Sequence, residues 1–210
     1  MAFSCLVFDC DGVILESVPI KTRAFVRIAA PFGPEAVDSL VMYHKAHGGV
    51  SRYKKFEWLY REVLGCEITQ EELADLGRLY SEIAFEELCR CALVPGAEAV
   101  LKSWKGRIPM YVCSGAPHEE LNLILTRRGL DHYFAGIYGS PPAKAELLNG
   151  ILKRAKVAPA TTVMVGDSVT DLDAAEAVGT RFYGRGSELQ GGSFPWGEDL
   201  TGLNGWLESL

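Results

Sequence analysis

The chain alternates short apolar segments with stretches of helical periodicity, and this alternation limits its fold more than any other feature of the sequence. The pattern is typical of a parallel β-sheet whose strands are connected by crossover helices. Gly129 and Gly179 stand where two of the helices should end, because a left-handed glycine closes a helix with little strain. We predict strands at Phe3–Phe8, Met110–Cys113, Gly136–Tyr138, Thr162–Val165 and Arg181–Tyr183, and helices at His118–Arg128, Ala145–Lys156 and Asp171–Val178. The predicted fold class is therefore α/β, with a Rossmann-like parallel sheet as its core.

One interval, from Ser17 to about Arg90, breaks the alternation because every segment in it has a helical pattern. Ser51 suits the N-cap of one helix in this interval, and Gly65 suits its end. Thr69 and Glu72 have the spacing of a capping box, in which each side chain satisfies a backbone N–H of the other residue. The whole interval is therefore predicted to be helical.

This interruption predicts two domains. Residues 17–90 form a helical cap domain, inserted into an α/β core domain made of residues 1–16 and 91–210. A cap inserted after the first strand can cover the carboxyl edge of the sheet, where open α/β folds bind their ligands. Residues 184–197 are rich in glycine and serine, and we expect them to form a long loop.

The composition limits the binding partners and the cellular compartment that we expect for this protein. A net charge of −6 argues against nucleic acid, because binding to a phosphate backbone requires a basic face. No apolar run is as long as a membrane span, and Asp9 interrupts the first one, so neither membrane binding nor a secretory leader is expected. The six cysteines contain no C-x-x-C pair, which is typical of free thiols in a reducing cytoplasm. No pattern in the sequence predicts an oligomeric state.

Two acidic residues follow the first predicted strand directly. Asp9 and Asp11 lie two positions apart and are followed by Gly12. Ionised carboxylates this close repel each other, so the pair requires a divalent cation or a shared proton. Taken alone, an acidic pair before a glycine is more typical of a simple turn.

The fourth predicted strand also ends in acidic residues, Asp167 and Asp171. The carboxyl ends of neighbouring parallel strands meet at one edge of a sheet, so these residues should lie near the first pair. Four acidic residues at two strand ends make an oxygen-rich site that suits Mg²⁺ better than zinc. Either later residue could instead cap the following helix, and Asp171 could do both.

Two further strand ends supply groups that complement an anion. Ser114 and Gly115 follow the second strand, where a hydroxyl lies beside backbone N–H groups, and Lys144 precedes the helix after the third strand. Each of these residues alone is more typical of a turn or an exposed surface. Because they stand in order at successive strand ends, all four sites are expected to converge on one crevice.

The four sites resemble the motifs of the haloacid dehalogenase (HAD) superfamily, in its subfamily with a helical C1-type cap after the first motif. The resemblance spans nearly the whole chain and is nearest to the phosphoglycolate phosphatases and the β-phosphoglucomutase-like phosphatases. It implies a Mg²⁺-dependent phosphatase that hydrolyses a small phosphorylated metabolite. The matching residues are Asp9 and Asp11 for the D-x-D-G-V signature, Ser114 for the second motif, Lys144 for the third, and Asp167 with Asp171 for the fourth.

The resemblance also implies a role for each residue. Asp9 attacks phosphorus and forms an aspartyl-phosphate. Asp11 protonates the leaving oxygen and later activates water, which requires a raised pKa for Asp11 when substrate is bound. Lys144, Ser114 and the backbone at Gly115 hold the phosphoryl oxygens. The implied Mg²⁺ ligands are Asp9, the backbone carbonyl of Asp11, Asp167 and, through water, Asp171.

The predicted cap has a cluster of cations at the start of a helix. Arg52, Lys54 and Lys55 lie in its first turn, where the helix dipole favours anions instead. A bound anion would resolve this conflict, and the flexible Gly48–Gly49 pair would let the loop before the helix close over the site. A solvated basic surface explains the cluster of cations equally well. The segment Gly49–Arg52 resembles the cap substrate loop of sugar-phosphate mutases. We therefore predict that Arg52 binds the substrate, and we rank Lys54 after it as a second substrate-binding residue.

Two alternatives to a phosphatase are a phosphomutase of the same fold and a non-enzymatic phospho-ligand-binding protein. The mutases of this superfamily carry a histidine in the first cap helix where this chain has Lys21, so water is the expected acceptor. Lys21 and Arg23 either contact the substrate or lie on an exposed helix face. A binding protein gains nothing from a nucleophile paired with an acid, so Asp9 and Asp11 argue against that alternative.

Overall fold

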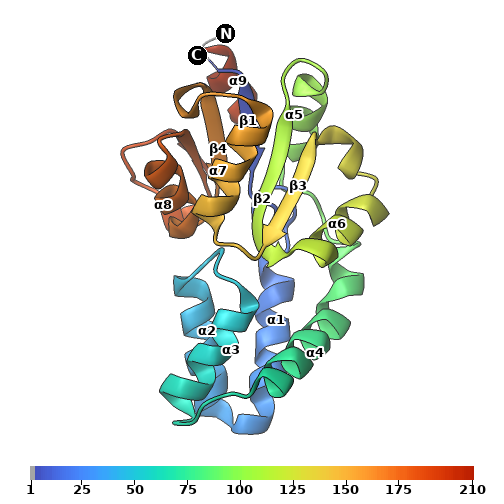
Figure 1. The fold of residues 1–210 in the computed structure, drawn as a ribbon, viewed down its shortest axis with the longest axis vertical. Coiled ribbons are helices and arrows are strands. Elements are labelled where there is room, and N and C mark those ends of the chain that lie inside the picture. The colour runs from blue at the N-terminus through green and yellow to red at the C-terminus, as the bar shows by residue number, and fades with distance from the viewer. Residues whose placement is uncertain (1–2) are drawn as a thin grey trace.

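In the computed structural model, which describes residues 3–210, six parallel strands form one sheet with helices on both faces (Figure 1). The strand order is β3-β2-β1-β4-β5-β6. The α/β class with a parallel sheet is confirmed, and all five predicted strands are present. The strands are β1 (Cys5–Phe8), β2 (Met110–Pro117), β3 (Gly136–Ser140), β4 (Thr162–Gly166), β5 (Arg181–Arg185) and β6 (Trp196–Gly197).

The central strands are buried on both sides, which accounts for their continuous apolar sequences. Alternate residues of β1 point to opposite faces. Leu6 and Phe8 pack into one cluster with α5, α6 and α9, whereas Cys5 and Val7 pack into the other with α7 and α8. The core helices are α5 (Ala97–Trp104), α6 (His118–Arg127), α7 (Lys144–Ala155), α8 (Val169–Val178) and α9 (Leu203–Glu208).

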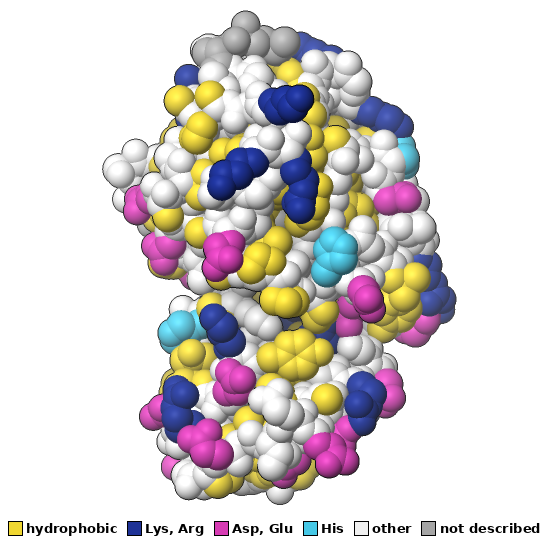
Figure 2. Space-filling view, viewed as in Figure 1, with side chains coloured by type: hydrophobic (Ala, Val, Ile, Leu, Met, Phe, Trp, Pro, Cys, Tyr) yellow, Lys and Arg dark blue, Asp and Glu magenta, His cyan; other side chains and the backbone are white. Residues whose placement is uncertain are grey.

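Four further helices lie together at one end of the sheet, below it in Figure 1, and all of them fall within the predicted cap of residues 17–90. Phe25, Phe56 and Tyr80 form their aromatic core, with the Phe25 ring centroid 4.9 Å from that of Tyr80. The Thr69–Glu72 capping box is present at the start of the longest of these helices. The helices are α1 (Val18–Ala29), α2 (Pro34–Ala46), α3 (Arg52–Trp58) and α4 (Gln70–Leu88). Figure 2 shows a waist where this helical part meets the sheet part.

The fold differs from the prediction in two places that concern the site. Strand β2 continues to Pro117, so Ser114 and Gly115 lie within the strand and not beyond its end. The segment predicted as a long loop contains a short helical turn, Ser187–Leu189, and the two-residue strand β6, whose Trp196 Nε1 donates to the Gly186 carbonyl at 2.6 Å. A strand of two residues is too short to show periodicity, which is why the sequence did not reveal it. Within residues 3–210, no helix is both long and apolar enough to cross a membrane.

Candidate active site

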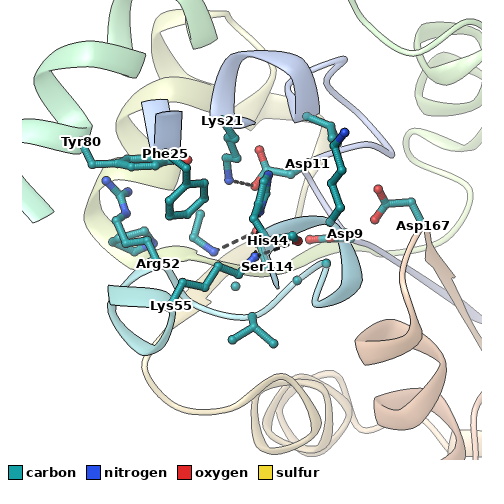
Figure 3. Close-up of a pocket in the computed structure, with 18 of the residues that line it drawn as sticks. Asp9, Asp11, Lys21, Phe25, His44, Arg52, Lys55, Tyr80, Ser114 and Asp167 are labelled. Atoms are coloured by element: carbon teal, nitrogen blue, oxygen red, sulfur yellow. Dashed lines mark hydrogen bonds and ion pairs between the residues drawn. The ribbon is translucent and has the colours of Figure 1, made fainter. Parts of the chain in front are cut away.

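A small cavity of about 90 Å³ lies where the carboxyl ends of β1, β2 and β4 face the cap helices (Figure 3). The close-up shows Asp9 and Asp167 toward one end of this cavity and Arg52 with Tyr80 toward the other. The core contributes acidic and hydroxyl groups, and the cap contributes cations and aromatic rings. The residues that line the cavity include Asp9, Asp11, Ser114, Gly115, Asp167, Lys21, Phe25, His44, Arg52, Lys55 and Tyr80.

Three carboxylates meet at the core end of the cavity. One oxygen each from Asp9, Asp167 and Asp171 lies within 4.8 Å of the others. Asp9 is 2% exposed, and the Cys10 backbone N–H donates to its Oδ1 at 2.7 Å, which fixes its orientation. Lys144 Nζ lies 3.1 Å from Asp9 Oδ2 and 2.6 Å from Asp171 Oδ1. One lysine therefore faces three carboxylates.

This imbalance of charge appears in the pKa values. Burial raises the pKa of Asp9 to about 7, with the charge of Lys144 opposing the rise and Asp171 and Asp11 adding to it. Burial, followed by the charges of Asp9 and Asp171, raises the pKa of Asp167 well above its ordinary value. Burial disfavours the charged form of Lys144, but the charges of Asp171 and Asp9 outweigh it and raise the lysine pKa. Within residues 3–210, Asp167 makes no ion pair.

Gly12 is required by the close packing of this cluster. Its φ of +75° lies in the left-handed region, and a β-carbon at this position would overlap the Asp167 carboxylate. A side chain here would therefore strain the backbone and displace an acidic residue of the site. The glycine of the D-x-D-G sequence lets the β1 loop pass directly beside the β4 loop.

Asp11 is separate from the acidic cluster and is held by the cap. Lys21 Nζ of α1 makes an ion pair with Asp11 Oδ2, and Ser17 Oγ donates to Asp11 Oδ1 at 2.7 Å. Burial favours the neutral carboxyl, but the charge of Lys21 and the hydrogen bonds from Lys21 and Ser17 outweigh it and lower the pKa of Asp11. In the free protein Asp11 is thus ionised, whereas its inferred role requires a proton on it when substrate is bound.

Ser114 and the cap loop meet at the same edge of the sheet. Ser114 is buried, and its Oγ accepts from the Ala116 backbone N–H at 3.2 Å. A β-carbon on Gly115 would overlap the Gly49 carbonyl, so the cap loop lies directly against β2. Thr170 Oγ1 of α8 donates to the Gly48 carbonyl at 2.6 Å, which ties the same loop to the core. The glycine pair predicted to let the loop close is in contact with the core here.

Asp171 caps a helix with one carboxylate oxygen and contributes the other to the acidic cluster, in line with the expectation that it could serve both purposes. Its Oδ2 accepts from the Ser168 backbone N–H at 3.2 Å and from Ser168 Oγ at 2.6 Å, which caps α8. Its Oδ1 accepts from Lys144 at 2.6 Å and belongs to the acidic cluster.

The predicted cap residues are placed differently from one another. Arg52 is buried and lines the cavity, but its guanidinium already pairs with Glu120 of α6 at 2.5 Å, donates to Ser81 Oγ at 2.9 Å and lies 4.4 Å from the Tyr80 ring centroid. Lys54 is exposed and lines a separate groove, so the structure does not bring it to this cavity. Arg52 is thus in the site and Lys54 lies outside it.

Three other basic residues of the cap differ in whether they reach the cavity. Lys55 is 2% exposed and lines the cavity, although the sequence placed it below Arg52. Lys21 holds Asp11, whereas Arg23 is exposed and pairs with Glu87 on the cap surface. Lys55 lies one helical turn after Arg52, so the i, i+3 spacing was a signal that both could face one side. No comparable signal marks His44, which also lines the cavity.

Comparisons with known proteins show which family and fold this chain resembles. A family model described as haloacid dehalogenase-like hydrolase matches residues 3–179. The chain is 25% identical over 194 residues to a phosphoglycolate phosphatase of Haemophilus influenzae, covering 87% of this chain and 85% of that protein. It is 27% identical over 193 residues to a phosphorylated carbohydrates phosphatase of Thermotoga maritima, covering 85% and 83%. A solved β-phosphoglucomutase from Clostridium difficile has the same fold, with a TM-score of 0.82, 18% identity, and coverage of 99% of this chain and 96% of that one.

Proposed function

The chain belongs to the haloacid dehalogenase-like hydrolases, and from this membership we propose that it is a phosphatase, which hydrolyses a small phosphorylated metabolite through an aspartyl-phosphate on Asp9. One structural observation supports the aspartyl-phosphate: Asp9 is a buried carboxylate with Lys144 Nζ 3.1 Å away and a second carboxyl, Asp11, on the same loop. Relatives named for phosphoglycolate, phosphorylated carbohydrates and fructose 1-phosphate support a substrate of phosphoglycolate or sugar-phosphate type.

In the proposed reaction, each step is assigned to a residue in or beside the cavity. Asp9 attacks phosphorus, the bond between phosphorus and the leaving oxygen breaks, and Asp11 donates a proton to that oxygen. A bound phosphate brings negative charge next to Asp11, which raises the low pKa that Lys21 and Ser17 give it in the free protein. Asp11 then takes a proton from a water molecule, which attacks phosphorus. The bond between phosphorus and the Asp9 oxygen breaks, so that phosphate leaves and the Asp9 carboxylate is regenerated. Lys144 and Ser114 hold the phosphoryl oxygens as charge builds on them.

The acidic cluster fits a divalent metal. Three carboxylates within 4.8 Å face a single lysine, and two of them have raised pKa values because they are buried together. A cation with hard oxygen ligands offsets this repulsion, and carboxylates are the ligands that Mg²⁺ uses. Mg²⁺ would be held by Asp9, the backbone carbonyl of Asp11, Asp167 and, through water, Asp171. When bound, it reduces the repulsion between Asp9 and the phosphate that Asp9 attacks.

The proposed activity is tested with p-nitrophenyl phosphate and a panel of phosphorylated metabolites that includes 2-phosphoglycolate, fructose 1-phosphate and β-glucose 1-phosphate. We expect release of inorganic phosphate with Mg²⁺ and none with EDTA. Release that does not require a divalent ion would contradict the metal assignment. Failure to hydrolyse any phosphomonoester would contradict the phosphatase, and conversion of β-glucose 1-phosphate to the 6-phosphate would favour a mutase.

Asp167→Asn is expected to raise the Mg²⁺ concentration for half-maximal activity by about tenfold or more, because the amide keeps the shape and removes a charged ligand. The measurement is phosphate release against Mg²⁺ concentration at saturating substrate. Asp173→Asn, which changes an exposed carboxylate on α8, the helix that follows Asp167, is the matched control. An unchanged half-activation in Asp167→Asn would remove Asp167 from the metal site.

Arg52→Ala is expected to lower kcat/KM by about tenfold for p-nitrophenyl phosphate and for 2-phosphoglycolate alike. The reason is that Arg52 joins the cap to Glu120 of the core, and removal of one partner leaves a half-buried charge unpaired. Glu120→Ala should have a similar effect, and the double variant should lose little more than either single one. A loss confined to 2-phosphoglycolate would instead show that Arg52 binds the substrate, as the sequence predicts.

A further inference from the structure

We propose that Lys55 selects the substrate by binding a carboxylate on the alcohol part of the phosphomonoester. This inference rests on the proposed phosphatase activity and specifies its substrate as a short phosphorylated hydroxy acid. It follows from the contacts of Lys55, from the ion pairs that the other cations around the cavity make, and from the neutral ring of His44.

Lys55 is a buried cation without a counter-ion. Its side chain lines the cavity and is shielded from solvent, with the residue 2% exposed. Its ammonium donates to His44 Nδ1 at 2.9 Å and lies 3.4 Å from the His44 carbonyl. Within the part of the chain that the structure describes, no carboxylate forms an ion pair with it. A buried charge of this kind is strongly unfavourable unless an anion joins it.

The other buried or half-buried cations around the cavity are already neutralised. Lys21 pairs with Asp11, Arg52 pairs with Glu120, and Lys144 pairs with Asp9 and Asp171. Lys45 also lines the cavity, but it is exposed to solvent. Among residues 3–210, Lys55 is therefore the buried cation at this cavity whose charge remains available to a ligand.

His44 positions the ammonium and cannot neutralise it. Burial, followed by the charges of Lys55 and Lys21, lowers the pKa of His44 to about 3, so the ring is neutral and its Nδ1 accepts the hydrogen bond. The Phe25 ring centroid lies 5.5 Å from Lys55 Nζ and 4.6 Å from the His44 ring. These two rings cover part of the ammonium and lower the local polarity, which strengthens an ion pair formed there.

The occupant is a carboxylate because the site offers a single ammonium in a small space. One uncompensated positive charge matches the single charge of a carboxylate, whereas a phosphate carries about two and is usually held by several donors. The cavity is small, about 90 Å³, and must also hold the phosphoryl group next to Asp9, which favours a short alcohol over a long one. Glycolate and similar hydroxy acids meet both conditions.

The test compares two substrates of equal length, 2-phosphoglycolate and ethyl phosphate, which differ in a carboxylate and a methyl group. Lys55→Met should lower kcat/KM for 2-phosphoglycolate by about 10- to 100-fold, the range for one hydrogen bond between charged groups, mostly through KM. For ethyl phosphate and p-nitrophenyl phosphate the change should stay within about twofold. Lys153→Met, which removes a lysine from an exposed position on α7, is the control for loss of a charge.

The Tm of Lys55→Met and the pH dependence of the substrate preference distinguish substrate binding by Lys55 from a purely structural role. Methionine keeps the length of lysine and removes an uncompensated buried charge, so the Tm of Lys55→Met should equal or exceed that of the wild type. Burial, then the charge of Lys21, lowers the pKa of Lys55 to about 7, while Asp11 and Glu188 raise it and Lys144 lowers it. The ammonium is thus lost as pH rises through about 7, and the preference for 2-phosphoglycolate over ethyl phosphate should decline there in the wild type only.

Failure of this inference can be told apart from failure of the proposed function. Equal losses on 2-phosphoglycolate and ethyl phosphate, or no loss on either, would overturn the role of Lys55 while phosphatase activity stands. A loss confined to fructose 1,6-bisphosphate relative to fructose 1-phosphate would overturn the carboxylate and assign a second phosphate. If the wild type hydrolyses no phosphomonoester, calorimetric binding of 2-phosphoglycolate to the wild type and Lys55→Met still decides the inference, which requires at least tenfold weaker binding by the variant.

Discussion

Asp9→Asn should reduce turnover of p-nitrophenyl phosphate and 2-phosphoglycolate by roughly 10⁴-fold or more, the scale seen when a catalytic nucleophile is removed. The amide has the shape of the carboxylate but lacks its nucleophilic charge. The fold should remain intact, because Lys144 keeps Asp171 as a partner at 2.6 Å and the repulsion with Asp167 is relieved. Initial rates with Mg²⁺ and thermal unfolding of both proteins provide the measurement.

The covalent step has its own readout. Beryllium fluoride with Mg²⁺ should form a stable phosphate mimic on Asp9 in the wild type, and none in Asp9→Asn. Asp38→Asn, which alters an exposed carboxylate of α2, should behave as the wild type in both assays. Substantial turnover by Asp9→Asn would exclude an aspartyl-phosphate on this residue.

Lys144→Ala should lower kcat by about 10²–10³-fold, the scale for loss of one group that stabilises charge in the transition state. Its ammonium lies between Asp9 and Asp171, where it is the cation closest to the nucleophile among the described residues. Without it, three carboxylates within 4.8 Å have no buried counter-charge, so the Tm should also fall. Mg²⁺ should restore part of the lost Tm, because it offsets the same repulsion.

Lys153→Ala separates this effect from loss of a lysine on the same helix, since Lys153 is exposed on α7. The lysine control should keep the activity and the unfolding temperature of the wild type. If Lys144→Ala retains full kcat, Lys144 does not serve the third motif, and the pairing with Asp9 is only structural.

The core of the fold and its acidic cluster could be predicted because each strand and the acidic residues at its end are adjacent in the sequence. A strand, the turn that ends it and the carboxylates on that turn are consecutive in sequence, and parallel strands bring their carboxyl ends to one edge. Asp9, Asp167, Asp171 and Lys144 therefore meet in the structure as the sequence predicts. The two-residue strand β6 could not be predicted, because its pairing with Gly184 and Arg185 leaves no periodic signal.

The sequence by itself determined the parallel sheet, the positions of the acidic residues and the presence of a basic helix start in the cap. Only the tertiary structure decided which cations remain available to a ligand. Arg52 is neutralised by Glu120, a residue 68 positions away, whereas Lys55, one helical turn further on, meets the neutral ring of His44. The electrostatic state of a buried charge depends on the groups packed around it, and here those groups come from other helices of the fold.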